Sequence, residues 1–96
     1  GDMINAQEAL QMGLANKVVK HEELMDASIE VAKKIIQKAP LAVKLAMTAV
    51  HYGTETDLEA GLVLESAFGN LLFCSKDKEE GVKAFMEKRK PTFTGN

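Results

Sequence analysis

The stretch DLEAGLVLESAFGNLLFC, residues 57–74, decides the fold, because it is an apolar segment with the length and spacing of a helix. Its large apolar residues cover most of the circumference instead of one stripe, so we expect this helix to be enclosed on several sides. Thr56 and Glu59 form a predicted capping box at its start. The apolar positions are Leu58, Leu62, Leu64, Phe68, Leu71, Leu72 and Phe73.

The N-terminal side of this segment begins with a short helix. Asn5 and Glu8 form a second predicted capping box, and Gly13 lies where a left-handed C-cap would end a helix over residues 6–12. The valines of residues 14–19 have no helical spacing and favour at most one short extended segment.

Three further helices are predicted, and prolines mark two of their ends. Pro40 disfavours helical geometry in the residue before it but suits the first turn of a new helix. Ser75 or Asp77 is expected to cap the last helix, which Pro91 ends. The other two helices are predicted at residues 24–39, with amphipathic spacing, and at residues 41–52. Gly61 and Gly69 are expected to allow close helix packing.

Length and composition predict one globular domain over residues 1–96, with 46% hydrophobic and 27% charged residues. Lysine and arginine number 12 against 14 acidic residues, so the chain lacks the basic excess of a nucleic-acid-binding protein. The longest nearly uncharged stretch, residues 60–75, is interrupted by Glu65 and is shorter than a membrane span of about 20 residues. Neither a nucleic acid nor a membrane is therefore expected as a partner.

Candidate catalytic residues are few, and a structural role is favoured for each. His21 and His51 lie in different elements without a carboxylate or cysteine at ligand spacing, so we interpret them as helix-end polar residues. Glu65 has apolar neighbours that would raise its pKa, yet a buried carboxylate is usually paired, which favours a salt bridge or hydrogen bond. The pair Glu79 and Glu80 suits the positive end of a helix dipole.

Cys74 is the only cysteine, so it forms no internal disulfide and suits a reducing compartment. We expect it to be a small buried hydrophobe. No cluster with metal-ligand spacing and no glycine-rich phosphate loop is present. The sequence therefore predicts no catalytic residue and no metal ligand.

The run Lys88-Arg89-Lys90 beside Phe85 is the one group of residues whose chemistry suits a binding site. One interpretation is a solvated helix end, where cations complement the helix dipole. The other is a phosphate site, because lysine is a point charge for a phosphate and phenylalanine offers an apolar face for a base such as adenine. The residues alone leave both open.

The first nine residues have the pattern G-D-x-I-x-A-x-E-A, and residues 91–95 have the pattern P-x-F-x-G. Between them lie Gly13-Leu14, Val18-Val19, Ala39-Pro40, the helix with Gly61-Leu62, Glu65 and Phe68, Glu80-Gly81, and Ala84-Phe85-Met86-Glu87-Lys88-Arg89. Taken in this order, these motifs resemble the crotonase superfamily, and specifically the C-terminal third of enoyl-CoA hydratases. Ala15 is a minor departure, because valine is common there in that family.

This resemblance implies an all-α fold, a bundle of about five short helices that forms the C-terminal helical domain of the crotonase fold without its ββα spiral core. In that family two catalytic glutamates and the amides of an oxyanion hole lie upstream of the G-D motif. The parent enzyme would reversibly hydrate 2-enoyl-CoA to 3-hydroxyacyl-CoA in fatty-acid metabolism, and the 96-residue chain alone is expected to be inactive. No cofactor is implied beyond the coenzyme A that the substrate carries.

The resemblance also implies where the substrate and other subunits bind. Phe85 and Lys88 match residues that contact coenzyme A bound largely by a neighbouring subunit. A homo-oligomer is expected, either a trimer or a dimer of trimers, in the bacterial cytoplasm in preference to the mitochondrial matrix. The alternatives are another acyl-CoA enzyme of the superfamily, such as an isomerase or dehalogenase, and a helical assembly module without chemistry.

Overall fold

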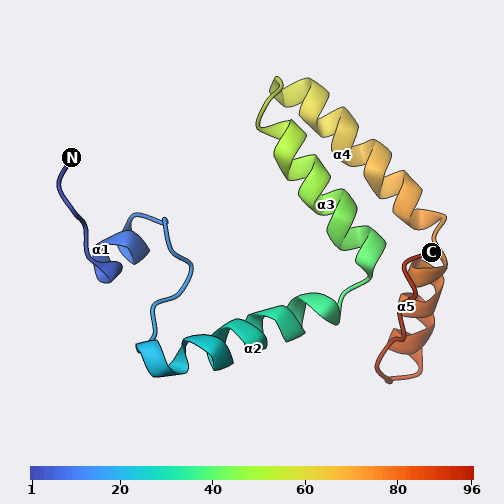
Figure 1. Cartoon of the computed structure of the whole chain (residues 1–96). Helices are drawn as coiled ribbons and strands as arrows, with labels where there is room; N and C mark the ends of the chain where they lie inside the picture. Colours follow the sequence, from blue (N-terminus) through green and yellow to red (C-terminus); the bar gives the residue numbers. More distant parts are fainter. The chain divides into compact units, whose positions relative to one another are not determined.

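A computed structural model describes residues 1–96, and all of its regular secondary structure is helical (Figure 1). No strand is present, and residues 14–20 form an irregular connection. The all-α prediction is therefore confirmed. The chain divides into two compact units, Gly1–Ala32 and Lys33–Asn96. In chain order the elements are α1 (Ala6–Gln11), a 3₁₀ turn η1 (His21–Glu23), α2 (Leu24–Ile36), α3 (Pro40–Gly53), α4 (Leu58–Phe73) and α5 (Lys76–Met86).

Helix α1 of the first unit is capped at both ends, as its sequence predicts. The Asn5 side-chain oxygen accepts from the amides of Gln7 and Glu8, each at 3.0 Å. The Glu8 carboxylate accepts from the Asn5 amide in return at 2.7 Å. Gly13 ends the helix with a φ of +77°, a left-handed value that glycine adopts without steric cost. These caps satisfy backbone groups that a helix of six residues would otherwise leave without partners.

Helix α2 ends at Ile36, earlier than the predicted residue 39. The residue before Pro40 is kept out of the helical region by the proline ring, and Ala39 has a ψ of 119°. Pro40 itself occupies the first turn of α3, as predicted. The expected apolar side of α2 is present but uncovered, since Leu24 and Ile35 are both about half exposed.

Within the second unit, α3 and α4 lie side by side as a helical hairpin (Figure 1). A Cβ atom built on Gly61 would lie 3.7 Å from the Cα atom of Gly53, so the two glycines let the backbones approach closely at the closed end. The same role was expected for Gly69, and this prediction was wrong. A Cβ atom there would meet nothing within 4 Å.

The N-cap of α4 is Asp57, and the predicted capping box of Thr56 and Glu59 does not form. Asp57 has an extended backbone with φ −69° and ψ 161°, and its carboxylate accepts from the Ala60 amide at 2.9 Å. The register is thus one residue later than predicted. An ionised carboxylate also complements the positive end of the helix dipole, which a threonine hydroxyl does not.

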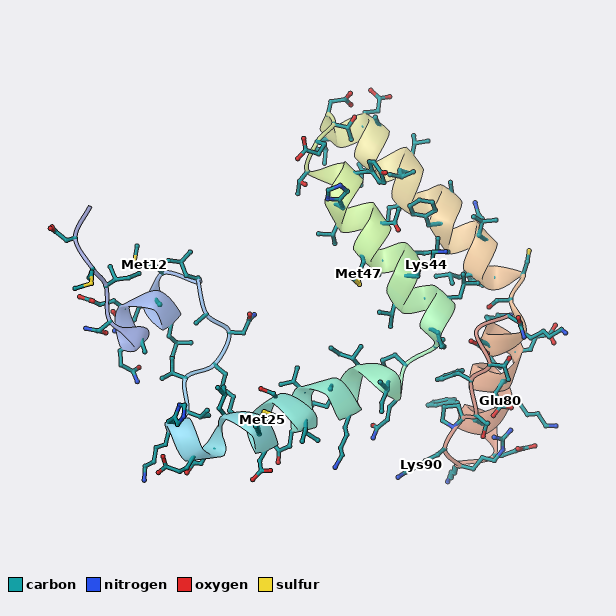
Figure 2. The ribbon with its side chains drawn as sticks, in the orientation of Figure 1. Met12, Met25, Lys44, Met47, Glu80 and Lys90 are labelled. Atoms are coloured by element: carbon teal, nitrogen blue, oxygen red, sulfur yellow. The ribbon has the colours of Figure 1, made fainter.

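Apolar side chains remain largely uncovered in both units. Ala84 is the one buried hydrophobic residue. On α4, the side chains of Leu58, Val63 and Phe73 are each about two-thirds exposed or more, in keeping with the prediction that this helix needs partners on several sides. Met12, Met25 and Met47 likewise project from the ribbon into solvent (Figure 2).

None of the helices taken singly is long and apolar enough to cross a membrane. Only α4 and α5 taken together, with a 70° bend between them, have the required length and composition.

Replacing the true N-cap of α4 should weaken the second unit. We expect Asp57→Ala to lower the free energy of unfolding by about 1 kcal/mol, because an orphan amide loses its acceptor. Thr56→Ala is the matched control and should change the free energy by less than about 0.5 kcal/mol. Urea unfolding followed by far-UV circular dichroism measures both. An equal or larger loss in the Thr56 variant would return the cap to the residue that the sequence pattern favours.

Candidate functional site

The basic run of residues 88–90 follows α5 in a tight turn instead of forming its last turn. Helix α5 ends at Met86, so Arg89 lies beyond the helix, whereas the sequence predicted a helix that Pro91 ends. The Lys88 amide donates to the Phe85 carbonyl at 3.2 Å, and the Arg89 amide donates to the Ala84 carbonyl at 3.0 Å. This pair of bonds is a Schellman motif, which satisfies the last carbonyl groups of a helix.

Lys88 occupies the position in this motif where glycine is usual. Its φ is 53°, and it is the only residue other than glycine with a positive φ in the chain. The left-handed conformation costs a residue with a Cβ atom on the order of 1 kcal/mol. Such a conformation persists when its neighbours hold it in place, and two ion pairs lie beside it here.

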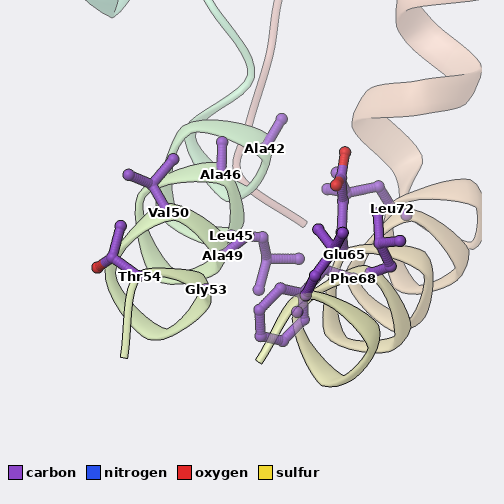
Figure 3. A pocket seen from close by; sticks show the side chains of 14 residues that line it. Ala42, Leu45, Ala46, Ala49, Val50, Gly53, Thr54, Glu65, Phe68 and Leu72 are labelled. Atoms are coloured by element: carbon purple, nitrogen blue, oxygen red, sulfur yellow. The ribbon is translucent and has the colours of Figure 1, made fainter. Parts of the chain in front are cut away.

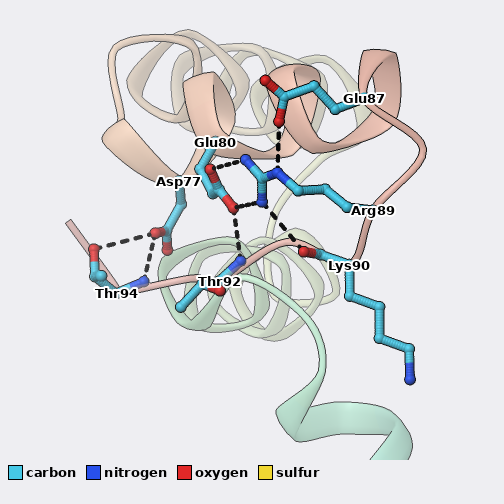
Figure 4. Close-up of polar contacts among 7 residues, drawn as sticks. All are labelled: Asp77, Glu80, Glu87, Arg89, Lys90, Thr92 and Thr94. Atoms are coloured by element: carbon cyan, nitrogen blue, oxygen red, sulfur yellow. Dashed lines mark hydrogen bonds and ion pairs between the residues drawn. The ribbon is translucent and has the colours of Figure 1, made fainter.

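Arg89 forms both ion pairs (Figure 4). Its Nη1 and Nη2 atoms donate to the two carboxylate oxygens of Glu80 at 2.6 and 2.8 Å. Its Nε atom donates to Glu87 at 2.6 Å, and Nη1 also donates to the Lys90 carbonyl at 3.2 Å. The guanidinium group thus connects Glu80 of α5 with Glu87, which precedes Lys88, and with Lys90, which follows Arg89.

Glu80 is held in its ionised form by this arrangement. Hydrogen bonds from Arg89, together with one from the Thr92 amide at 2.8 Å, lower the pKa of Glu80 from 4.5 to about 2. The same pairing raises the pKa of Arg89 further above its ordinary value. Glu80 was interpreted from the sequence as a partner of the helix dipole only, and its actual role is to anchor the segment that follows the helix.

A second carboxylate of α5 anchors the end of the chain. Asp77 is buried and accepts from the amides of Thr94 and Gly95 at 2.7 and 2.8 Å. Its own amide donates to the Asn96 carbonyl at 3.2 Å. The N-cap of α5 is Ser75, whose hydroxyl accepts from the Lys78 amide at 3.1 Å, so the alternative cap Asp77 is wrong.

The C-terminal segment also has an aromatic anchor. A Cβ atom built on Gly81 would lie 3.6 Å from the ring of Phe93, so glycine at this position leaves room for the ring beside α5. Gly95 has a φ of +81° and lies beside Pro40 at the start of α3. One signal in the sequence could have indicated this anchoring. Asp77 and Glu80 are spaced three residues apart, which places both carboxylates on one helix face.

The two predicted binding residues lie at this turn. The Phe85 side chain is 81% exposed, and Lys88 is exposed and forms no ion pair. The sequence predicted one basic patch at residues 88–90, but the guanidinium group of Arg89 is paired with two carboxylates of the chain itself. Lys88 and Lys90 are therefore the cations of this run that remain available to a ligand, and Figure 4 shows the Lys90 side chain extending away from the network.

An apolar groove of about 630 Å³ runs between α3 and α4 (Figure 3). Phe68 and Leu72 line it from α4, and Ala46 and Ala49 line it from α3. Glu65 is its only acidic residue, is exposed, and makes no hydrogen bond or ion pair. The predicted pairing of Glu65 was thus wrong, because α3 lines the other side of the groove without a basic side chain.

The remaining candidate catalytic or metal-binding residues are one cysteine and two histidines, and they form no site together. Cys74 is exposed at the end of α4, so its predicted burial was wrong. His21 begins η1 and His51 lies in the last turn of α3, which confirms both as helix-end residues. No group of three or more residues able to hold a metal ion is present.

Comparisons with known proteins agree with the motifs and the fold. The family model described as enoyl-CoA hydratase/isomerase matches residues 1–96. A crotonyl-CoA hydratase from Syntrophomonas wolfei is 42% identical over 96% of this chain and 35% of its own length. A short-chain-enoyl-CoA hydratase from Clostridium acetobutylicum is 47% identical over 91% of this chain and 33% of its own length. The chain belongs to the enoyl-CoA hydratase/isomerase family.

Solved structures of relatives show which part of their fold this chain matches. The crystal structure of an enoyl-CoA hydratase from Bacillus anthracis superposes with a TM-score of 0.92 and 41% identity, over 95% of this chain and 35% of that chain. The chain thus spans about a third of the length of the relatives that it matches, and it corresponds to the helical C-terminal segment of the crotonase fold, as predicted.

Acid should release the segment that Glu80 anchors. Because the pKa of Glu80 is lowered in the folded chain, its ionised form stabilises the fold fully above pH 4.5, and this contribution is lost as the pH falls towards 2. We expect protection of the Thr92 amide from hydrogen exchange, corrected for intrinsic exchange, to fall over that range. Glu80→Gln should lower this protection at neutral pH and remove its pH dependence, whereas Glu79→Gln should not. Wild-type protection that stays constant down to pH 2 would contradict the role of Glu80.

Proposed function

We propose that this chain is the C-terminal segment of an enoyl-CoA hydratase, which reversibly adds water to 2-enoyl-CoA to give 3-hydroxyacyl-CoA. The observation that supports this most is the match to the family over residues 1–96, together with 42% and 47% identity to a crotonyl-CoA hydratase and a short-chain-enoyl-CoA hydratase. The family description also includes isomerases, so isomerisation of an enoyl-CoA is the second candidate.

Within that enzyme, we propose that Phe85 and Lys88 contact the coenzyme A portion of the substrate, bound largely by a neighbouring subunit. Lys88 has an exposed ammonium group without an ion-pair partner, which suits a phosphate. Phe85 lies three residues before it and exposes an apolar ring that suits adenine. Both contacts would lie away from the reacting carbon atoms.

The chain offers no acid–base pair for the hydration step itself. Asp77 and Glu80 are engaged in hydrogen bonds to the C-terminal segment, and Glu65 has no second carboxylate or histidine beside it in the groove. Proton transfer to and from the substrate would therefore depend on residues outside this segment, and the 96-residue chain by itself should not turn over crotonyl-CoA.

The role of Lys88 can be tested in the intact enzyme that contains this segment. Lys88→Ala should raise KM by about five-fold or less and leave kcat unchanged, because a remote phosphate contact stabilises ground and transition states equally. The effect should shrink at high ionic strength. Phe85→Ala should raise KM without altering the salt dependence.

Lys76→Ala is the matched control, because it removes an exposed lysine from the opposite end of α5. It should leave KM unchanged. A large fall in kcat at unchanged KM in the Lys88 variant would instead assign Lys88 to the chemical step or to assembly of the site.

We also propose that the enzyme is a homo-oligomer, a trimer or a dimer of trimers, in which the apolar surface of α4 is covered. Leu58, Val63 and Phe73 are largely exposed, and burial of apolar surface stabilises association by about 25 cal/mol per Å² before entropy is subtracted. The 96-residue chain itself should self-associate at tens of micromolar. Light scattering measures this directly, and a cooperatively folded monomer would contradict the proposal.

The bacterial cytoplasm remains our proposal for the location of the enzyme. Cys74 is an exposed thiol without a disulfide partner, which suits a reducing compartment. Cell fractionation followed by detection of the protein would test it.

A further inference from the structure

The turn that contains Lys88 is braced from one side of α5. Glu87 and Arg89, the residues that flank Lys88, are joined through their side chains by the ion pair of 2.6 Å. Arg89 is joined in turn to Glu80 by two parallel hydrogen bonds. A left-handed residue other than glycine is thus held between two neighbours whose side chains are both anchored.

Glu80 also anchors the chain on the far side of the turn. Its Oε1 atom accepts both from Arg89 and from the Thr92 amide, at 2.6 and 2.8 Å. The four residues from 89 to 92 therefore begin and end at hydrogen bonds to Glu80 of α5. Removing this one carboxylate would take away the side-chain contact of Arg89 with α5 and the acceptor of the Thr92 amide together, and would leave Arg89 its pair with Glu87.

The charge of Glu80 would by itself oppose an anionic ligand. Lys88 and Lys90 supply the positive charge of the turn, and the charge of Arg89 is offset by Glu80 and Glu87. If attraction between charges alone governed binding, loss of Glu80 would make the turn more positive and strengthen the binding of a phosphate. A bracing role predicts the opposite sign.

We propose that Glu80 and Arg89 are positioning residues, which bind no substrate but hold Lys88 in the left-handed turn from which its ammonium group meets a phosphate of coenzyme A. The identity of the phosphate rests on the function proposed above. The bracing of the turn rests on the hydrogen bonds alone.

Steady-state kinetics of the intact enzyme test the functional part. Glu80→Gln should raise KM for the enoyl-CoA by about five-fold or less and leave kcat unchanged. In a Lys88→Ala background the same substitution should leave KM unchanged, because a residue that acts only through Lys88 has no further effect once Lys88 is gone. A KM that falls or stays constant in Glu80→Gln, or additive effects in the double variant, would overturn the proposal.

Nuclear magnetic resonance of the 96-residue chain tests the bracing without any substrate. Glu80→Gln, and independently Arg89→Lys, should lower the heteronuclear NOE of the Lys88 and Arg89 amides, while Glu79→Gln should not. Arg89→Lys keeps the charge and loses the two-pronged contact, so it keeps the test valid if Glu80→Gln does not fold.

Titration of the intact enzyme with coenzyme A separates the two proposals. Weaker binding by Lys88→Ala than by the wild type supports both. If the two affinities are equal while the turn loosens in the Glu80→Gln and Arg89→Lys variants of the 96-residue chain, the coenzyme A assignment fails and the brace stands. A turn that is unchanged in both variants overturns the brace, whatever coenzyme A does.

Discussion

The carboxylates of Asp77 and Glu80 accept the hydrogen bonds that hold the last segment of the chain against α5. Residues 91–96 belong to no helix or strand, so their amides need acceptors from elsewhere. Charge-assisted bonds of 2.7 to 2.8 Å to Thr92, Thr94 and Gly95 supply them. The turn at Lys88 and the place of Phe93 beside Gly81 both depend on this return of the chain.

Arg89 and Lys88 show how adjacent cations can have different roles. The planar guanidinium group of Arg89 matches the two oxygens of Glu80 and still reaches Glu87, so its charge is used within the chain. Lys88 has a flexible side chain with a compact charge and takes part in no such pair. One basic run thus contains a structural arginine and a lysine that is free to meet an anion.

The second unit buries few apolar side chains of its own, and the apolar surface left exposed suits contact with other protein. Ala84 is buried at 1% exposure, while α4 leaves most of its large apolar side chains in solvent. The groove beside α3 is apolar apart from Glu65 and Thr54 (Figure 3). A surface of this kind is typical of a segment that is completed by contact with other protein, which agrees with a chain spanning about a third of its relatives.

Local interactions were predictable from the sequence, and interactions across the second unit were not. The caps at Asn5 and Gly13 and the break at Pro40 depend on residues within one or two turns, and the family motifs made the all-helical fold recognisable. The one-residue shift of the α4 cap shows the limit even there, because Thr56 and Asp57 are adjacent side-chain acceptors and the extended backbone at Asp57 decides between them.

The tertiary structure alone decided which charges are paired and which side chains are covered. Burial was expected for Glu65 because its sequence neighbours are apolar, and for Cys74 because a free cysteine is usually buried, yet exposure depends on what lies opposite a helix face. The bond from Thr94 to Asp77 joins residues 17 apart, beyond the reach of any helical periodicity. Composition and periodicity therefore determined the helices, whereas the return of the chain onto α5 determined which of three consecutive cations became structural.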